Sequence, residues 1–380
     1  PAVIGSLLSH GAAVSVADSH GATPLSLATK RGYTEAADLL RKAGGAAASP
    51  ASAAPLVTVN QAVTASLTTI QSGMKAFAER VQCVSCHHQG FGMMTLGAAA
   101  QRGFAVDKAL IGSYFQRMGE DGKEGGPYIH QALQDKTVIN VVRGVEIGDF
   151  AIGSGYILGA LVSNNVPPNP GFAEGALLLA NLQSPNGSWT YGMDREPLQS
   201  SYFTTTALVL RVLRAYGPKE AEPQLAACYD RAKRWLATTP APNTEDKAAR
   251  LFGLKWAGAT AEERQSALRE LLAAQRPDGG WSQTAAMPSD AHATGIALYA
   301  LHVGGDLPTD AAAYQRGVQF LLRTQDEDGS WYVNKRTMPA NNYFDAGFPH
   351  GESQYTSFDA TCWATLALLQ CSEPPKAARQ

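Results

Sequence analysis

Three short segments of this chain share one pattern: Gln, three residues, Gly, one residue and Trp. They occupy residues 183–189 (QSPNGSW), 275–281 (QRPDGGW) and 325–331 (QDEDGSW). Each follows an amphipathic helical run, and the Pro, Asp or Asn before the Gly is typical of a turn that ends a helix. Each also precedes a loop and a more apolar helical run. The three copies therefore predict a repeated helical hairpin with this turn between its two helices.

The spacing of the turns predicts the number of hairpins. Trp281 and Trp331 are 50 residues apart, whereas Trp189 and Trp281 are 92 apart, so the longer interval holds one degenerate repeat near residues 231–242. We expect six hairpins, at residues 58–103, 107–165, 170–217, 221–258, 261–304 and 309–371. Six hairpins that close into a ring form an all-α fold, an α/α toroid. The second helix of each pair is richer in apolar and small residues, so it is expected to form the inner wall.

The three turns resemble the QW motifs of the terpenoid cyclase and protein prenyltransferase superfamily. This resemblance implies the toroid fold, and it implies little about function because the motif stabilises the scaffold and does no chemistry. In each turn we expect the Gln to bond backbone groups at helix ends and the Trp to stack over the turn.

The first part of the chain, residues 1–45, forms a separate segment. Its run TPLSLA at residues 23–28 resembles the T-P-L-x-x-A pattern of ankyrin repeats, although Ser26 replaces the usual His. One and a half repeats cannot bury a solenoid core alone. The segment is expected to be either a protein-docking surface or a structural cap, and the start in mid-pattern predicts a mature or trimmed form. A linker of small residues at 46–56 leads to the toroid at 57–374.

The composition excludes some function classes. Charged residues make up 17% of the chain and the net charge is −2. No run of Lys and Arg is present, so nucleic-acid binding is not expected. The longest apolar stretches, such as residues 175–182, are too short to span a bilayer, so no transmembrane segment is expected.

Residues 81–94, VQCVSCHHQGFGMM, contain a second motif. Cys83, Cys86 and His87 form C-x-x-C-H at residues 83–87, the turn of the first predicted hairpin and hence a rim of the toroid. This is the attachment signature of c-type haem, in which two thiols bind the porphyrin vinyl groups and the His binds the iron. Structural zinc would need further ligands, and a free or disulfide-bonded pair is the other alternative. We expect one covalently attached haem c.

The order of these features resembles bacterial ankyrin/squalene-cyclase-like proteins that carry a cytochrome c signature. That resemblance implies an exported, haem-bearing toroid. Haem is attached to C-x-x-C-H outside the bacterial cytoplasm, so a location in the periplasm, outside the cell or on the cell surface is expected.

The haem iron needs a second axial ligand from another segment. His350 is favoured, because it lies in a long loop of the last hairpin and the last hairpin neighbours the first in a ring. The alternatives are rim methionines, other histidines, water or an open site; the side chains concerned are Met193, Met287, Met338, His88 and His130.

Two carboxyl groups are candidates for chemistry in the cavity. Asp290 follows Ser289 at the start of an inner helix, where it is either a helix N-cap or a cavity acid. By resemblance, squalene-hopene-type cyclases protonate an alkene with a D-x-D-D run, from which the PSDA sequence here departs. Asp359 is the second candidate. With Cys362 and His350 it has the ligand types of the prenyltransferase zinc site, but not the D-x-C spacing.

Three functions follow from these patterns. The first is an exported monohaem c-type cytochrome that passes single electrons to or from a redox protein docked on the ankyrin-like segment. The second is a terpenoid-cyclase-like enzyme that acts on an apolar substrate in the toroid cavity. The third is a structural subunit of a larger haem-containing assembly. A cavity lined by aromatic residues, with an isolated acid, would favour the enzyme.

Overall fold

The computed structural model of the chain describes residues 1–17, 21–31, 33–46, 57–80, 86–135, 137–138, 150–192, 200–336 and 344–373. The chain divides into two compact units, Pro1–Thr58 and Val59–Gln380. None of the described helices combines the length and the apolar character that crossing a membrane requires.

The described residues of the first unit form three short helices, α1 (Ala2–Ser9), α2 (Pro24–Lys30) and α3 (Thr34–Lys42). A capping box begins α2: the Thr23 side chain accepts a hydrogen bond from the Ser26 backbone N–H, and the Ser26 hydroxyl accepts one from the Thr23 backbone N–H. Leu25, Ala37 and Leu40 belong to its small buried core. The Thr-Pro-Leu sequence therefore starts a helix and places its Leu in the core.

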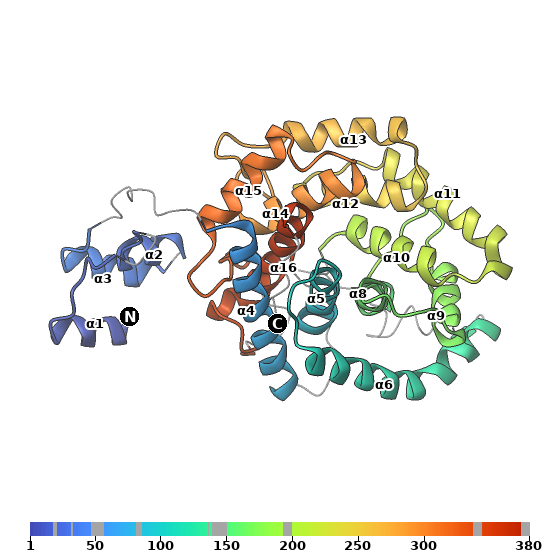
Figure 1. The fold of residues 1–380 in the computed structure, drawn as a ribbon, viewed down its shortest axis with the longest axis horizontal. Coiled ribbons are helices and arrows are strands. Elements are labelled where there is room, and N and C mark those ends of the chain that lie inside the picture. Colours follow the sequence, from blue (N-terminus) through green and yellow to red (C-terminus); the bar gives the residue numbers. More distant parts are fainter. Residues whose placement is uncertain are drawn as a thin grey trace, which may run out of the picture. The chain divides into compact units, whose positions relative to one another are not determined.

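The second unit is a ring of six helical hairpins (Figure 1). Its outer helices are α4 (Val59–Arg80), α6 (Lys108–Gln134), α9 (Pro170–Asn181), α11 (Glu222–Thr238), α13 (Ala261–Ala273) and α15 (Ala312–Thr324). Its inner helices are α5 (Gly92–Gln101), α8 (Phe150–Ser163), α10 (Tyr202–Tyr216), α12 (Thr244–Trp256), α14 (Ala291–Tyr299) and α16 (Gln354–Cys371). Shorter turns are the π-helices η1 (Cys86–Phe91) and η4 (Ala300–Gly304) and the 3₁₀ helices η3 (Lys219–Ala221) and η5 (Gly351–Ser353).

The inner helices pack on one another in order around the ring, and α16 returns to contact α5 and η1. Residues Thr356 to Leu369 of α16 are all buried, which explains why this helix is apolar on every side rather than amphipathic. Small residues let neighbouring helices approach: a Cβ at Gly295 of α14 would lie 2.6 Å from the backbone N of Ala364 in α16. The predicted all-α toroid of six hairpins is confirmed.

The Gln of each QW turn connects one hairpin to the next. The Gln325 amide donates to the carbonyl of Gly329 in its own turn (3.0 Å) and to the carbonyl of Ala62 in α4 (2.9 Å). The second bond joins the last hairpin to the first and closes the ring. The same pair of bonds recurs from Gln183 to Gly187 and Cys228, and from Gln275 to Gly279 and Ala313.

The Trp of each turn fastens the outer helix to the inner helix of the same hairpin. In the third turn the Trp331 indole N–H donates to the Leu321 carbonyl (2.9 Å), and its backbone N–H donates to the Thr361 hydroxyl (3.1 Å). The corresponding partners are Leu179 and Thr206 for Trp189, and Leu271 and Thr294 for Trp281. The sequence analysis placed Gln at helix ends within the turn; the structure adds its reach to the next hairpin.

The Gly of each turn has a geometric reason. Gly329 has a φ of +84°, and a Cβ there would lie 2.5 Å from the Ala65 carbonyl group in α4. Both the left-handed backbone and the close approach of α4 require Gly. The turn glycines 187 and 279 meet backbone of the next outer helix in the same way.

We expect Gln325→Ala to lower the free energy of unfolding by about 1–3 kcal/mol, because a buried side chain that bonds two carbonyl groups is lost. Urea denaturation of the full chain measures this change. The matched control is Gln315→Ala, since Gln315 is exposed on α15, the outer helix that ends at Gln325, and bonds one exposed carbonyl. Equal effects of the two substitutions would show that the bond to α4 does not hold the ring.

Candidate functional site

The C-x-x-C-H motif precedes the first inner helix. Cys83 lies outside the described residues, and Cys86 and His87 are described only by their backbone, in η1. The next residue, His88, is fully buried, and its ring lies 4.9 Å from that of Phe77 and 4.2 Å from that of Phe358. The chain beyond the motif therefore belongs to the packed wall of the toroid.

The structure describes four of the expected distal ligands, namely His88, His130, Met287 and His350. His350 Nε2 lies 2.7 Å from the Ser330 hydroxyl, so this side chain is part of the third QW turn. Met287 is in the loop before α14, where its carbonyl accepts from Arg276. Met193 and Met338 lie outside the described residues. Among the described residues, no group of three or more His, Cys, Asp or Glu side chains is arranged to hold a metal ion.

A buried acid–imidazole pair lies at the start of the last two inner helices. His292 Nε2 of α14 is 2.7 Å from Asp359 Oδ2 of α16, and both side chains are 2% exposed. Burial raises the pKa of the Asp359 carboxyl above its ordinary value, although His292 opposes the shift. Burial also opposes a charge on His292, but the neighbouring Asp359 outweighs it and raises the pKa of the imidazole. The pair therefore retains a proton more readily than either group does in water.

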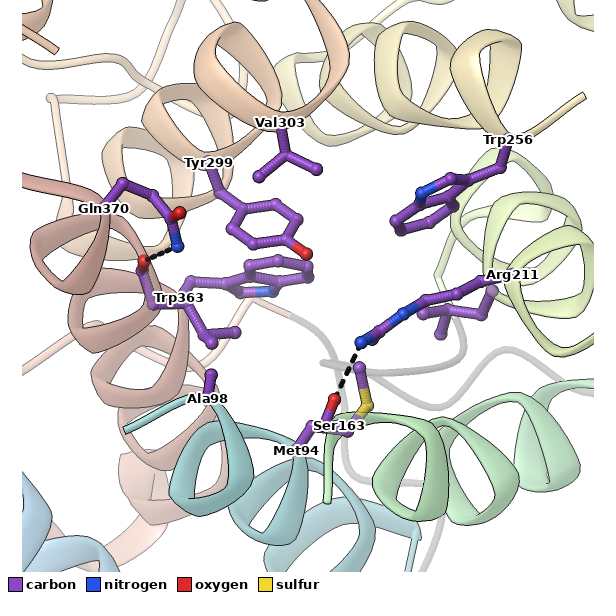
Figure 2. Close-up of a pocket in the computed structure, with 11 residues that line it drawn as sticks. Met94, Ala98, Ser163, Arg211, Trp256, Tyr299, Val303, Trp363 and Gln370 are labelled. Atoms are coloured by element: carbon purple, nitrogen blue, oxygen red, sulfur yellow. Dashed lines mark hydrogen bonds between the residues drawn. The ribbon is translucent and has the colours of Figure 1, made fainter. Parts of the chain in front are cut away.

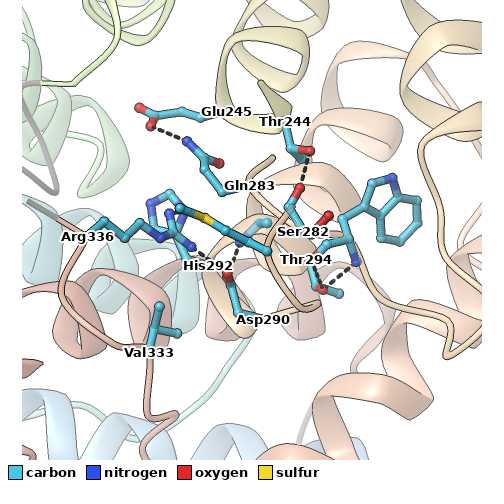
Figure 3. A network of polar contacts seen from close by, with 12 residues as sticks. Thr244, Glu245, Ser282, Gln283, Asp290, His292, Thr294, Val333 and Arg336 are labelled. Carbon is cyan, nitrogen blue, oxygen red and sulfur yellow. Dashed lines mark hydrogen bonds and ion pairs between the residues drawn. The ribbon is translucent and has the colours of Figure 1, made fainter. Parts of the chain in front are cut away.

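Asp290, by contrast, is an N-cap with an ion pair. Its Oδ1 accepts from the backbone N–H of Ala293 (2.8 Å), and its Oδ2 accepts from Arg336 (2.5 Å). Arg336 also lies 3.4 Å from His292 Nδ1, the ring nitrogen that does not contact Asp359. Figure 3 shows Arg336 next to His292. Since a guanidinium can only donate, this contact favours the tautomer whose proton is on Nε2, facing Asp359.

Glu245, at the start of α12, is a third buried acid of this region. Its Oε1 accepts from the Thr204 hydroxyl (2.8 Å), and its Oε2 lies 3.4 Å from the Gln283 amide (Figure 3). Burial raises the pKa of the Glu245 carboxyl, while His292 opposes the shift. Sequence analysis missed this residue. A usable signal exists, since Glu245 and His292 each stand two residues after the N-cap of an inner helix, Asn243 and Asp290.

A cavity of about 120 Å³ lies further along the same inner helices (Figure 2). All six inner helices contribute to its lining, which includes Met94, Leu208, Trp256, Tyr299 and Trp363. Trp363 is one helical turn beyond Asp359 in α16, and Tyr299 lies near the end of the helix that His292 begins. The two helices that carry the buried pair, α14 and α16, therefore also contribute to the wall of the cavity.

Aromatic rings continue outward from the cavity wall. The Trp363 ring centroid lies 4.8 Å from that of Phe91, 5.5 Å from that of Tyr299 and 6.3 Å from that of Phe252. Phe252 and Tyr299 are 6.0 Å apart. Of these four rings, Trp363 and Tyr299 line the cavity, and aromatic surface of this kind suits an apolar or positively charged occupant.

Comparison with known proteins points to cyclases, although no protein-family model matches the chain. A squalene–hopene cyclase of Bradyrhizobium diazoefficiens is 28% identical over 201 residues, 48% of this chain and 22% of that protein. Lanosterol synthase ERG7 of Saccharomyces cerevisiae is 28% identical over 110 residues, 29% of this chain and 14% of that protein. The chain thus spans less than a quarter of the length of either relative.

Solved structures of low similarity were also found. A protein from Actinoplanes has a TM-score of 0.47 and 14% identity, covering 81% of this chain and 100% of that one. The type II terpene cyclase MstE from Scytonema, without ligand, has a TM-score of 0.45 and 14% identity, covering 83% of this chain and 99% of that one. Neither bears on the function inferred below.

These relatives overturn the first functional prediction. The chain was expected to be a monohaem c-type cytochrome with covalent haem c, and the curated relatives are cyclases instead. The prediction failed because a five-residue motif carries no information about the surrounding fold. The third function, a structural subunit of a haem-containing assembly, is overturned for the same reason. None of these relatives supports a redox partner. The second unit is a terpenoid cyclase-like toroid.

We expect Glu245→Gln to make stability less dependent on pH. The raised pKa means that the folded protein binds more protons than the unfolded chain above the ordinary Glu value of 4.5. Wild-type stability therefore falls as the pH rises through the raised pKa. Urea denaturation between about pH 5 and pH 8 should show a smaller fall for the variant. Glu352→Gln, at an exposed carboxyl, is the control; slopes identical to wild type in both variants would contradict the expectation.

Proposed function

We propose that the toroid is a terpenoid-cyclase-like enzyme that acts on an apolar substrate in its cavity. The observation that carries this proposal is the buried Asp359–His292 pair, one helical turn before the cavity-lining Trp363. The curated cyclase relatives support it over the other two functions.

The pair suits acid catalysis on an alkene. With His292 at Oδ2, the other oxygen of Asp359 has no hydrogen-bond donor among the described residues. A carboxyl group with a raised pKa can hold a proton there and deliver it to a carbon–carbon double bond. Loss of a proton from the resulting carbocation forms the product, and reprotonation of Asp359 restores the enzyme. The net reaction is an isomerisation or cyclisation without change of composition.

The aromatic wall suits the intermediate of such a reaction. A carbocation formed in the cavity would lie near the rings of Trp363, Tyr299 and Trp256, which line it. Cation–π contacts contribute about 0.5–2 kcal/mol each, and more where water is excluded. This wall, like the acid, is expected from the enzyme hypothesis.

The proposal assigns the acid to Asp359 rather than Asp290. Both oxygens of Asp290 are engaged, by the N-terminal N–H of α14 and by Arg336. Asp359 lacks such donors, and it is the more buried of the two. The missing D-x-D-D run is thus replaced by one carboxyl group whose partner comes from a different helix.

The volume of the cavity limits the size of the substrate, or of the part of it, that can bind inside. A void of about 120 Å³ is smaller than the roughly 300–1,000 Å³ of common ligand pockets. An engineered apolar cavity of about 150 Å³ holds benzene. The cavity therefore accommodates a short apolar substrate, or one end of a longer one.

We expect Asp359→Asn to reduce turnover at least about 100-fold, because the proton donor is lost. The assay incubates the protein with linear isoprenoid alkenes and alcohols and analyses the products by gas chromatography and mass spectrometry. In D₂O the wild-type product should carry deuterium at the protonated carbon. Asp310→Asn, at an exposed acid outside the cavity, is the matched control. Turnover by Asp359→Asn at the wild-type rate, or product without deuterium, would exclude this role.

We propose that the first unit is an ankyrin-like segment that docks a protein. The location outside the cytoplasm was expected from haem attachment, so it loses that support. Val3 and Leu7 of α1 are 72% and 55% exposed. Val3→Ser with Leu7→Ser should leave the melting temperature of the full chain unchanged, because an exposed docking face contributes no packing. A fall of several degrees would instead indicate a structural cap that packs within the protein.

A further inference from the structure

We propose that the toroid cavity binds the anionic head group of a short apolar molecule, a carboxylate or a phosphate, at Arg211. The inference deepens the proposed function, and it rests on that function for the view that this molecule is the substrate. Binding itself can be measured without turnover, so the two proposals are tested separately.

Arg211 brings a positive charge into an otherwise neutral cavity. Its Nη2 donates to the Ser163 hydroxyl (2.8 Å), and its Cζ lies 5.8 Å from the centroid of the Trp256 ring. Both partners are neutral, and no carboxylate forms an ion pair with Arg211 within the described part of the chain. The other residues that line the cavity carry no charge. An anion would therefore find a cation that nothing described neutralises.

A hydroxyl group faces the same hollow from the side of Trp363. Tyr299 and Arg211 both point into the hollow in Figure 2. The Tyr299 hydroxyl has no hydrogen-bond partner among the described residues, whereas the nearby Gln370 amide is engaged by the Leu366 carbonyl and by Arg102. The cavity thus offers a guanidinium fork and one further donor, which matches the several acceptor oxygens of a carboxylate or phosphate.

The remaining wall is apolar and sets the kind of chain that carries the head group. Met94, Leu208, Val303, Trp363 and Leu366 surround the space with aliphatic and aromatic surface. At about 120 Å³ the cavity accommodates roughly six carbon atoms, by comparison with the benzene-sized void above. In Figure 2, Trp363 lies across the hollow from Arg211. A molecule anchored at Arg211 would therefore extend its apolar part toward the helix that carries Asp359.

The test compares hexanoate, hexyl phosphate and 1-hexanol by isothermal titration calorimetry with the full chain at neutral pH. At least one anion should bind about tenfold or more tightly than the alcohol, because hydrogen bonds to a charged group are the stronger ones. Arg211→Gln should abolish this preference. Arg234→Gln is the matched control, since it removes the same charge from an exposed position on α11 and should retain the preference.

Two further measurements keep the proposal testable if Arg211→Gln does not fold. In the wild-type protein, raising the salt concentration should weaken binding of the anion and leave binding of 1-hexanol unchanged. Arg211→Lys should retain a reduced preference for the anion. Equal affinity for the anions and the alcohol, or an unchanged preference in Arg211→Gln, would overturn the proposal. Intact anion binding by Asp359→Asn without turnover would separate this site from the catalytic one.

Discussion

A buried amide group that reaches from one hairpin to the next is the contact on which the rest of this structure depends. Gln325 bonds a carbonyl group 263 residues away along the chain, and this bond joins the last hairpin to the first, beside the packing of α16 on α4 and α5. Only a closed ring turns six apolar helices toward a common axis. The cavity needs all six of them, so its existence depends on ring closure.

The same closure accounts for the electrostatics of the site. His292 and Asp359 come from the fifth and sixth hairpins, and the packing of α14 on α16 removes both from water. Burial without full compensation raises the pKa of a carboxyl group, and Glu245 responds in the same direction for the same reason. A fold that excludes water from its axis thus produces acids that retain their protons, next to aromatic rings that can stabilise a cation.

The fold and the site differ in how far they could be predicted. The six hairpins followed from a turn pattern that recurs three times between residues 183 and 331, so an error in any one segment mattered little. Asp359 could be named as a cavity candidate because, with Cys362 and His350, it has the ligand types of the zinc site in the prenyltransferases that the chain resembles. Its partner could not, since His292 is 67 residues away and nothing local indicates the pairing. The C-x-x-C-H motif gave a wrong prediction for the opposite reason. It is entirely local, so its five residues implied a cofactor whatever fold surrounds them.

The sequence by itself determined the helical hairpins, their number and the turns that join them. These depend on hydrophobic periodicity and on Gln, Gly and Trp at set spacings, which act over a few residues. Only the tertiary structure decided which buried acid keeps one oxygen without a donor among the described residues, which Arg faces the cavity and how large that cavity is. Those properties arise where helices that are distant in the sequence pack together. The burial of a group at such a place depends on the side chains that all the neighbouring helices contribute.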